Sequence, residues 1–442
     1  MENVSFITPL GLVFLAIMGL LIFALPRRLV FLPFIMTISY MTLGQRVYIA
    51  GMNFDMMRIL LLCGWVRLLF RKEIKAFDFT IIDKLIIWFV LSSVITATIL
   101  TPTMETFNNR MGAAYNTLLT FFLFRFLIRD TDDIIFMVKI MAIVILPLAV
   151  SMIIEKSTQR NIFSVFGDVP EFTMIREGSL RCQGPFRHPI LAGTFGATMF
   201  PLFFVIWSKQ TTGRVFAYVG IISSTIITVT TASSGPLLAY VASVIGLSFW
   251  SLRDKMRQVR WLLLACLVIL EMCMQSHIWF LIGKLSFIMG GTGWHRSELI
   301  NQAIEHFSEW GLLGTTYTAH WAKDNGLITL PEYPDMVDIT NQYIAIGIQG
   351  GILPLILFIS VIAYGFQGLG RTRHMLDGKP PYVQMIPWVL GSALFSHTVT
   401  FISVAYFDQM KFIWFLLLSL IAFVTSLAIN NHDNNEAAFF RR

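Results

Sequence analysis

Long apolar stretches separated by short polar connections run along almost the whole chain. A helix needs about 20 residues to cross a hydrocarbon core about 30 Å thick, and most of these stretches approach that length. Backbone groups inside lipid must be hydrogen-bonded within the protein, and a continuous apolar run achieves this as a helix. We therefore predict an all-α, polytopic membrane helical bundle that forms a single domain over residues 1–442. About 13 spans are expected, at residues 9–25, 29–44, 56–70, 81–100, 111–128, 134–154, 188–208, 214–232, 235–252, 260–281, 341–366, 383–403 and 411–430.

Lysine and arginine are concentrated in every second connection, and this pattern predicts the side of the membrane on which each connection lies. Short cytoplasmic loops carry an excess of these bases. If the N-terminus lies outside, every base-rich short connection is cytoplasmic, and the number of spans is odd. The bases concerned are Arg27, Arg28, Arg71, Lys72, Lys75, Arg125, Arg129, Lys209, Arg214, Arg253, Lys255, Arg257, Arg260, Arg371, Arg373, Lys379, Arg441 and Arg442. The same alternation predicts that the two long connections, residues 155–187 and 282–340, lie on the outer face.

Both long outer loops are nevertheless basic, and histidines gather in and beside them. Long loops escape the topology rule, so a solvated charge explains any one of these bases taken alone. Together they mark the outer face as the place to look for chemistry. The residues are Lys156, Arg160, Arg176, Arg181, Arg187, His188, Lys284, His295, Arg296, His306, His320 and Lys323.

The string RCQGPFRHPILAG, from Arg181 to Gly193, sets two arginines and a histidine at a membrane boundary. Gly184-Pro185 predicts a turn, and Pro189 suits the first turn of a helix. Arg187 and His188 would then lie at the positive end of a helix, where an anion is favoured. Guanidinium groups beside a helix N-terminus are typical of a phosphate or diphosphate site.

The second long loop is predicted to be partly helical. Apolar residues recur at helical spacing after Arg296, which predicts an amphipathic helix on the membrane surface or over the end of the bundle. Its apolar face is expected to hold Leu299, Ala303, Phe307 and Trp310, with Ile300 and Ile304 beside them, and its polar face Ser297, Glu298, Asn301, Gln302, Glu305 and Glu309. Arg296, at the start of this helix, is a second candidate for anion binding. Where the chain re-enters the membrane, Asp338 or Thr340 is expected to cap the next helix, and Asn341 follows.

Composition excludes several classes of protein. Hydrophobic residues make up 56% of the chain and charged residues only 13%, about half the charge usual in soluble proteins. The net charge of +7 therefore indicates membrane topology and contact with a lipid bilayer rather than binding to nucleic acid. Four cysteines form no disulfide framework. No HExxH, CxxC or paired-carboxylate spacing is present, so neither a metal site nor a cofactor is predicted.

Four segments, taken in order, resemble the O-antigen ligase and O-antigen (exopolysaccharide) polymerase superfamily of integral membrane proteins. They are RCQGPFRHPILAG, TASSGPLLAY, HRSELINQAIEHFSEWGLLG and DITNQYIAIGIQGGILP, and they cover about 170 residues from Arg181 to Pro354. The resemblance implies a GT-C-like glycosyltransferase of the bacterial inner membrane with its active site facing the periplasm. Its donor would be a glycan linked to undecaprenyl diphosphate, and transfer would need no metal.

On that pattern Arg181 and Arg296 would hold the diphosphate, with Arg187 and Asn341 as further substrate-binding residues. The family often carries a histidine before the asparagine and an arginine after the serine of TASSG, where this chain has Thr340 and Ser234. The sequence therefore does not identify which residue acts as the general base. The candidates are His320, His188 and Asp338.

Three functions remain open at this stage. Loss of the histidine favours a polymerase, which joins lipid-linked repeat units and would have a chain-length regulator and a flippase as partners. A ligase, which passes the glycan to lipid A-core, is the alternative of the same class. A transporter or flippase of lipid-linked sugar is the alternative of another class, and it predicts bases that line a cavity within the membrane.

Overall fold

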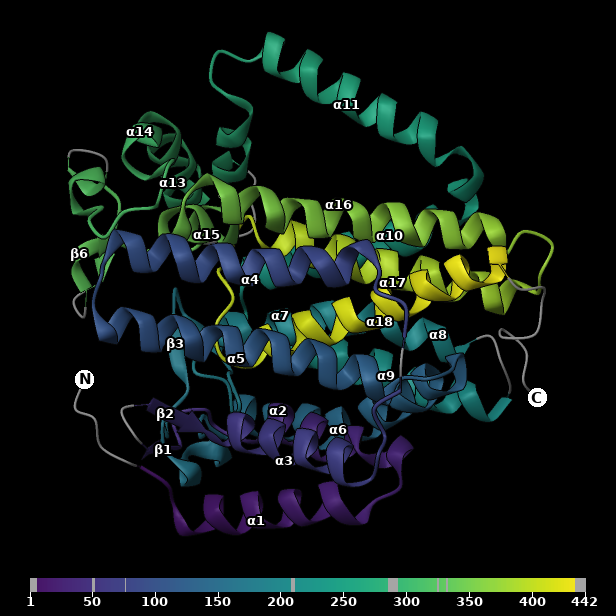
Figure 1. Ribbon diagram of the computed structural model, residues 1–442. Helices are drawn as coiled ribbons and strands as arrows, with labels where there is room; N and C mark the ends of the chain where they lie inside the picture. Colours follow the sequence, from purple (N-terminus) through teal and green to yellow (C-terminus); the bar gives the residue numbers. More distant parts are fainter. Residues whose placement is uncertain are drawn as a thin grey trace.

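The computed structural model describes residues 6–49, 52–75, 77–207, 211–284, 293–323, 326–330 and 333–433, and helices make up most of them (Figure 1). The α-helices are α1 (Pro9–Ala24), α2 (Phe31–Tyr40), α3 (Met56–Phe70), α4 (Ile81–Leu100), α5 (Met104–Leu127), α6 (Thr131–Thr158), α7 (Pro189–Met199), α8 (Phe204–Trp207), α9 (Thr211–Thr230), α10 (Ser234–Ser248), α11 (Met256–Cys273), α13 (Gly293–Glu305), α14 (Phe307–Trp310), α15 (Gln342–Gly350), α16 (Ile352–Met375), α17 (Pro381–Thr400) and α18 (Gln409–Asp433). Short 3-10 turns join several of them: η1 (Arg27–Leu29), η2 (Ile162–Phe166), η3 (Phe200–Phe203), η4 (Phe249–Lys255), η5 (Ile278–Phe280) and η6 (Ala319–Ala322).

The described strands are short and form three antiparallel hairpins. Each pairs two neighbouring segments of the chain, so no larger sheet is built from them. They are β1 (Arg46–Ile49) with β2 (Met52–Asp55), β3 (Met174–Arg176) with β4 (Ser179–Arg181), and β5 (Thr329–Leu330) with β6 (Tyr333–Val337).

Seven helical segments of the described chain are long and apolar enough to cross a membrane, and the fold is therefore that of an all-α membrane protein, as predicted. They are Ile81–Leu100, Thr131–Thr158, Pro189–Trp207, Gly213–Thr230, Ser234–Cys273, Ile352–Met375 and Gln409–Leu427. The segment Ser234–Cys273 covers the span predicted at 235–252 and most of the span predicted at 260–281, because η4 joins α10 directly to α11. Other predicted spans became shorter helices. The run predicted at 29–44, for example, contains a 10-residue α2.

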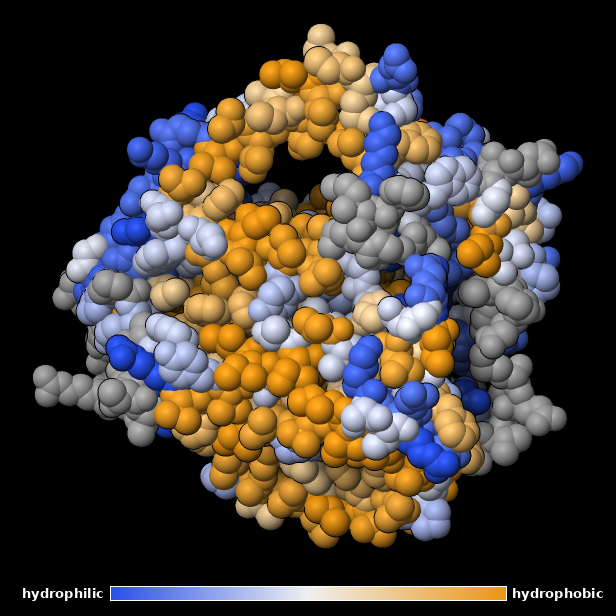
Figure 2. Space-filling model, turned by 180° about the vertical axis from the view of Figure 1, so that it is seen from behind, coloured by the Kyte–Doolittle hydropathy of each residue, from blue (hydrophilic) through white to orange (hydrophobic). Residues whose placement is uncertain are grey.

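The centre of the bundle is α18. Its side chains from Phe412 to Ser426 are buried, and it packs against α5, α16 and α17. Elsewhere apolar side chains face outward, and Figure 2 shows them as a broad band over the surface with polar residues towards its margins. A surface of this kind is suited to a lipid solvent, in which exposed leucine and isoleucine cost no free energy.

The helix α11 stands apart from the rest of the bundle. It has no buried residue, and its side chains from Arg260 to Cys273 are all exposed. Figure 1 shows it above α16 and α10, and Figure 2 shows an opening between it and the bundle.

The three hairpins and the helices of the second long loop gather at one end of the bundle, on the left in Figure 1. The described parts of residues 155–187 and 282–340 thus lie at the same end, although residues 188–281 separate them in the sequence. We call this the hairpin end.

At the other end of the bundle, bases pair with acids. Asp133 accepts Arg27 at 2.5 Å and Arg28 at 2.8 Å, and Arg67 pairs with Glu73 at 2.9 Å. Asp130 caps α6 by accepting the backbone N–H of Asp133, so the acidic run at 130–133 shapes the start of a helix. The buried charges of these pairs are thus compensated within the protein.

We expect Asp133→Ala to lower the free energy of unfolding by about 3 kcal/mol, because it leaves Arg27 without its buried partner. The side chain of Asp133 is inaccessible, and that of Arg27 is only 17% exposed. Glu171→Ala is the matched control: it breaks the Arg160 ion pair, whose side chains are 65% and 52% exposed, and should cost about 1 kcal/mol or less. Thermal unfolding in detergent micelles measures both, and equal losses would contradict the prediction.

Candidate functional site

Arg181 is the last residue of β4, at the hairpin end. The backbone just after it is held by Glu155 of α6, whose carboxylate accepts the N–H of Gln183 at 3.1 Å and of Gly184 at 2.9 Å. Gly184 has φ +56°, in the left-handed region that glycine adopts without strain, and it forms the predicted turn. This anchoring buries the Arg181 side chain, which is 5% exposed.

Arg296 lies in the first turn of α13 and is also 5% exposed. Its guanidinium lies against the start of α10: a Cβ added to Gly235 would come within 3.4 Å of Arg296 Nη2. Arg181 reaches the same place, because its Nη2 donates to Ser233 Oγ at 2.7 Å. The two arginines, 115 positions apart in the sequence, therefore converge on residues 233–235. We call Arg181, Arg296 and the first turn of α10 the α10 arginine site.

Neither arginine has an ion pair with a carboxylate among the residues that the structure describes. In both, the buried Nε has no hydrogen-bond partner. Burial, with the charges of Arg176 and Arg181, lowers the pKa of Arg296 to about 10, and burial also lowers the pKa of Arg181. An arginine stays protonated at neutral pH even so. Two uncompensated positive charges are thus held out of water at one point.

The first turn of α10 adds to the positive potential of this site. The leading backbone N–H groups of a helix have no acceptor within the helix, and the helix dipole makes this end positive. Ser233, the N-cap, gives its hydroxyl to the carbonyl of Thr231 and leaves the helix uncapped by its side chain. An anion placed here would meet guanidinium groups and backbone N–H donors together.

His188 lies beside this site. It is the N-cap of α7, where its Nδ1 accepts the backbone N–H of Ile190 at 3.1 Å. Gly193, one turn further on, lets α7 approach α10, since a Cβ there would lie 2.7 Å from Cβ of Pro236. Burial and the charges of Arg181 and Arg176 lower the pKa of His188 to about 4. A neutral histidine that accepts at Nδ1 carries its proton on Nε2, so His188 is arranged to donate a hydrogen bond rather than to take a proton.

Asp338 is attached to the same element as Arg296. Its backbone carbonyl lies 2.9 Å from Nε2 of His295, the residue before Arg296. Burial raises the pKa of its carboxyl group above the ordinary 3.8, and His295 opposes that shift. Of the three candidate bases, Asp338 is therefore the one that combines a carboxylate with a direct tie to α13.

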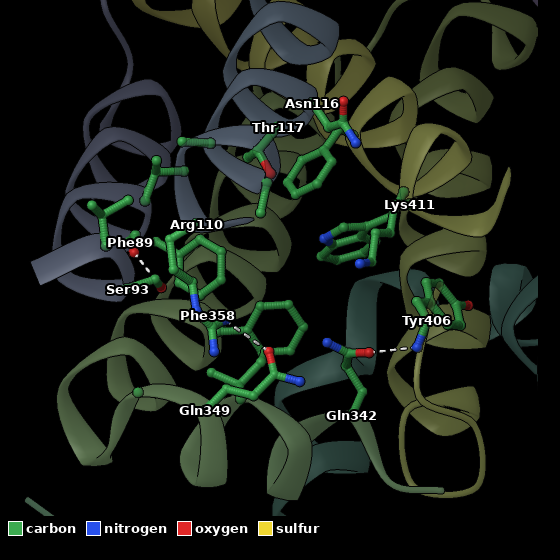
Figure 3. Close-up of a pocket in the computed structure, with 18 of the residues that line it drawn as sticks. Phe89, Ser93, Arg110, Asn116, Thr117, Gln342, Gln349, Phe358, Tyr406 and Lys411 are labelled. Atoms are coloured by element: carbon green, nitrogen blue, oxygen red, sulfur yellow. Dashed lines mark hydrogen bonds between the residues drawn. The ribbon is translucent and has the colours of Figure 1, made fainter. Parts of the chain in front are cut away.

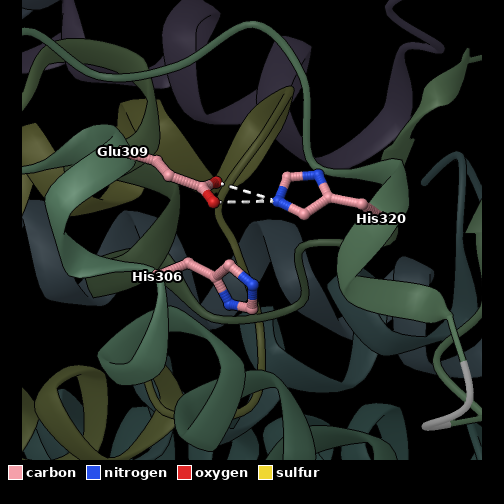
Figure 4. A group of neighbouring side chains, drawn as sticks. All are labelled: His306, Glu309 and His320. Carbon is pink, nitrogen blue, oxygen red and sulfur yellow. Dashed lines mark hydrogen bonds and ion pairs between the residues drawn. The ribbon is translucent and has the colours of Figure 1, made fainter.

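His320 lies in a different cluster. Its Nε2 pairs with Glu309 at 3.0 Å, and the ring of His306 is 5.1 Å away (Figure 4). The possible ligand atoms of His306, Glu309 and His320 lie within 4.8 Å of one another, close enough to suggest a divalent cation. They supply three of the four protein ligands that a structural zinc site uses. Sequence motifs could not indicate this grouping, because His320 comes from η6 and the other two residues from the region of α14.

Two further predicted site residues are engaged elsewhere. Arg187 pairs with Asp168 at 3.4 Å and with Asp408 at 3.5 Å. Asn341 caps α15 by accepting the N–H groups of Tyr343 and Ile344, and its amide donates to the carbonyl of Ile402. The cap expected at Asp338 or Thr340 is thus Asn341, because four residues separate the end of β6 at Val337 from Gln342, the first residue of α15.

The amphipathic helix of the second loop differs from the prediction in which face is buried. Leu299, Ala303 and Trp310 are buried as expected, but Ile304 and Phe307 are exposed. The polar side chains of Ser297, Glu298 and Gln302 are buried instead, because hydrogen bonds to Gly283 and among themselves satisfy them.

Three residues of the site were not singled out from the sequence: Glu155, Ser233 and Gly235. An acid at the end of an apolar span and a small-residue run before a helix were the signals that could have indicated them.

No family model and no curated protein matches this chain. The functional interpretation therefore rests on the residues described above and on the resemblance noted in the sequence.

We expect the stability of the protein to fall as the pH is lowered from about 6.5 to about 4, in the part that depends on His188. The pKa of His188 is lower in the folded chain, so the unfolded chain binds more protons in this window, and stability rises with pH across it. The measurement is the thermal midpoint against pH for the wild type and His188→Asn, which keeps a capping side chain. The difference between the two curves should be confined to that window, and parallel curves would refute the assignment.

Proposed function

We propose that this protein is a bacterial inner-membrane polymerase that joins undecaprenyl-diphosphate-linked oligosaccharide repeat units into an exopolysaccharide or O-antigen. The observation that carries the proposal is the α10 arginine site. Two buried guanidinium groups that have no carboxylate partner among the described residues meet at a helix N-terminus, where a diphosphate would supply the missing negative charge.

The surroundings of the site support a lipid-linked donor over a soluble one. From the first turn of α10, which lies below α11 in Figure 1, an exposed apolar stripe runs along the helix for about 12 Å. Its residues are Leu237, Leu238, Val241, Val244 and Ile245. A prenyl chain lying on this stripe would bring its diphosphate to Arg181 and Arg296.

The proposed topology has about 13 spans with the N-terminus outside, so that the hairpin end faces the periplasm. The distribution of bases supports this orientation. The compensated arginines at the other end, Arg27 and Arg28, belong to a short connection that the positive-inside rule assigns to the cytoplasm.

In the proposed reaction, the acceptor hydroxyl attacks the anomeric carbon of the donor sugar and inverts it. The bond from that carbon to the diphosphate oxygen breaks, and undecaprenyl diphosphate leaves with the bonding electron pair. Arg181 and Arg296 would stabilise the negative charge that develops on the leaving group, a role that needs no metal. Asp338 would take the proton of the hydroxyl, while His188 would donate a hydrogen bond.

One observation favours the transporter alternative. Arg58, Arg110 and Lys411 line a cavity among the helices, and a carrier of anionic lipid-linked sugar is expected to have such bases. The ligase alternative would use the α10 arginine site in the same way and differ in its acceptor. The experiment below is therefore done in micelles, where no membrane has to be crossed, and without lipid A-core.

We expect Arg181→Ala and Arg296→Ala each to lower the polymerisation rate by about 100-fold, since each removes a charged donor to the leaving group. Purified protein in detergent micelles is given undecaprenyl-diphosphate-linked repeat units, and polymer length is read on a gel. The lysine variants should recover activity only in part, because lysine cannot bind in a bidentate manner. Arg160→Ala, an exposed base of the same loop, is the control. Long polymer from both alanine variants would end this assignment.

We expect only one of the three candidate bases to be essential, and the geometry favours Asp338. Asp338→Asn should abolish polymer, whereas His320→Ala should retain it and His188→Asn should slow it. Because burial raises the carboxyl pKa, the acid limb of the pH–rate profile should lie above pH 3.8. Full activity in Asp338→Asn would remove this residue from the mechanism.

A further inference from the structure

A cavity of about 320 Å³ lies among α3, α4, α5, α15, α16 and α18 (Figure 3). Pockets of this volume hold small organic ligands in proteins. The lining residues of α4 and α5 lie around the middles of those helices, and those of α16 and α18 lie within the first two turns. The described lining includes neither Arg181 nor Arg296, so the cavity is distinct from the α10 arginine site.

Lys411 is the most informative residue of this cavity. Between Gln409 and Ser426 of α18, all side chains except that of Lys411 are buried. Lys411 is exposed, and its side chain lines the cavity. In Figure 3 its side chain reaches inward from α18. Its ammonium has no hydrogen bond or ion pair within the described part of the chain. A lysine held in this way on the central helix requires a ligand or water to solvate it.

Two arginines add to the positive charge of the walls. Arg110 donates to Gln349 Oε1 at 3.1 Å, and Arg58 donates from Nε to Asn116 Oδ1 at 2.9 Å. The carboxylate closest to Arg58 is Asp55, at 3.8 Å, which does not line the cavity. The described lining includes three bases and no acid, and it therefore favours an anion.

The rest of the lining suits a sugar. Aromatic rings form one part of the wall, with Phe358 and Phe401 5.2 Å apart and Phe401 and Trp414 5.0 Å apart. Amide side chains form another part. Gln342 accepts the backbone N–H of Tyr406 through Oε1, which leaves its NH₂ group for the cavity in Figure 3. Apolar ring faces combined with a few convergent polar groups bind and orient a small ligand.

The cavity and the α10 arginine site share a wall, the segment 401–408 between α17 and α18. Ser403 Oγ lies 3.2 Å from the Cβ position of Gly235, on the arginine side. Phe401 and Tyr406, from the same segment, line the cavity. The backbone N–H of Gln342 holds the segment through the carbonyl of Phe401. A glycan reaching from one compartment to the other would have to pass only this segment.

We propose that this cavity binds an acidic saccharide unit, a sugar ring that carries a carboxylate, with Lys411 as the partner of the carboxylate. The amides and ring faces favour a sugar over an acyl chain, and the three bases favour an acidic sugar over a neutral one. The assignment of this unit to the repeat that the protein polymerises rests on the proposed function, whereas binding itself does not.

The experiment measures binding to the full chain in detergent micelles by isothermal titration calorimetry. The probes are cellobiouronic acid, in which glucuronic acid is linked to glucose, and its neutral counterpart cellobiose. We expect the acidic disaccharide to bind more tightly. Lys411→Met should weaken its binding by about tenfold or more, as for the loss of one charged hydrogen bond. Lys411→Arg should retain most of the affinity. The matched control is Lys139→Met, because Lys139 is a lysine of α6 that lies over the ring of Phe216 in α9.

Equal affinity for the two disaccharides, or no effect of Lys411→Met with a normally folded variant, would overturn the proposal. Native mass spectrometry tests whether the cavity binds an anionic lipid instead. The proposal would also be overturned if the wild type retained phosphatidylglycerol, Lys411→Met lost it, and neither bound the saccharide. Arg181→Ala should keep the saccharide affinity, because Arg181 does not line the cavity. If the protein proved not to be a polymerase, saccharide binding in the cavity would still be expected. The two proposals can therefore be refuted independently of each other.

Discussion

A charged group removed from water costs free energy unless opposite charges or hydrogen bonds replace its hydration, and this constraint organises the bundle. At the end that carries the short base-rich connections, Asp133 and Glu73 satisfy the arginines that reach them. At the hairpin end, Arg181 and Arg296 are as deeply buried and meet no carboxylate within the described chain. The same protein thus compensates its charges at one end and leaves two of them open at the other.

The α10 arginine site depends on a set of buried contacts that hold irregular chain against helices. The carboxylate of Glu155 accepts hydrogen bonds from the backbone N–H groups of Gln183 and Gly184. Asn341 ties the start of α15 to the segment after α17. Each contact provides a hydrogen-bond partner for a backbone N–H or carbonyl group that would otherwise be buried among apolar helices without one. Precise placement of Arg181 and Arg296 therefore follows from the requirement that loops entering the bundle be hydrogen-bonded.

The sequence predicted what depends on local pattern. Apolar runs predicted the helices, the pair α10 and α11 among them, and Gly184-Pro185 predicted a turn. Arg181 and Arg296 were both singled out, but only the packing of α7, α10 and α13 brings them together. The inward polar face of α13 could not be predicted, because its partners lie in other segments. The cavity around Lys411 is built from six helices and a connecting segment, so no single stretch of sequence indicates it.

The segment 401–408 touches the α10 arginine site through Ser403 and the cavity through Phe401 and Tyr406. Any occupant that shifts this segment from one side alters the room and the hydrogen bonds available on the other. Thermodynamic linkage makes such an influence reciprocal: if filling the first compartment strengthens binding in the second, the second strengthens the first by the same factor. A single eight-residue connection thus supplies a physical route by which an occupant of the cavity and an anion at the α10 arginine site would affect each other's binding.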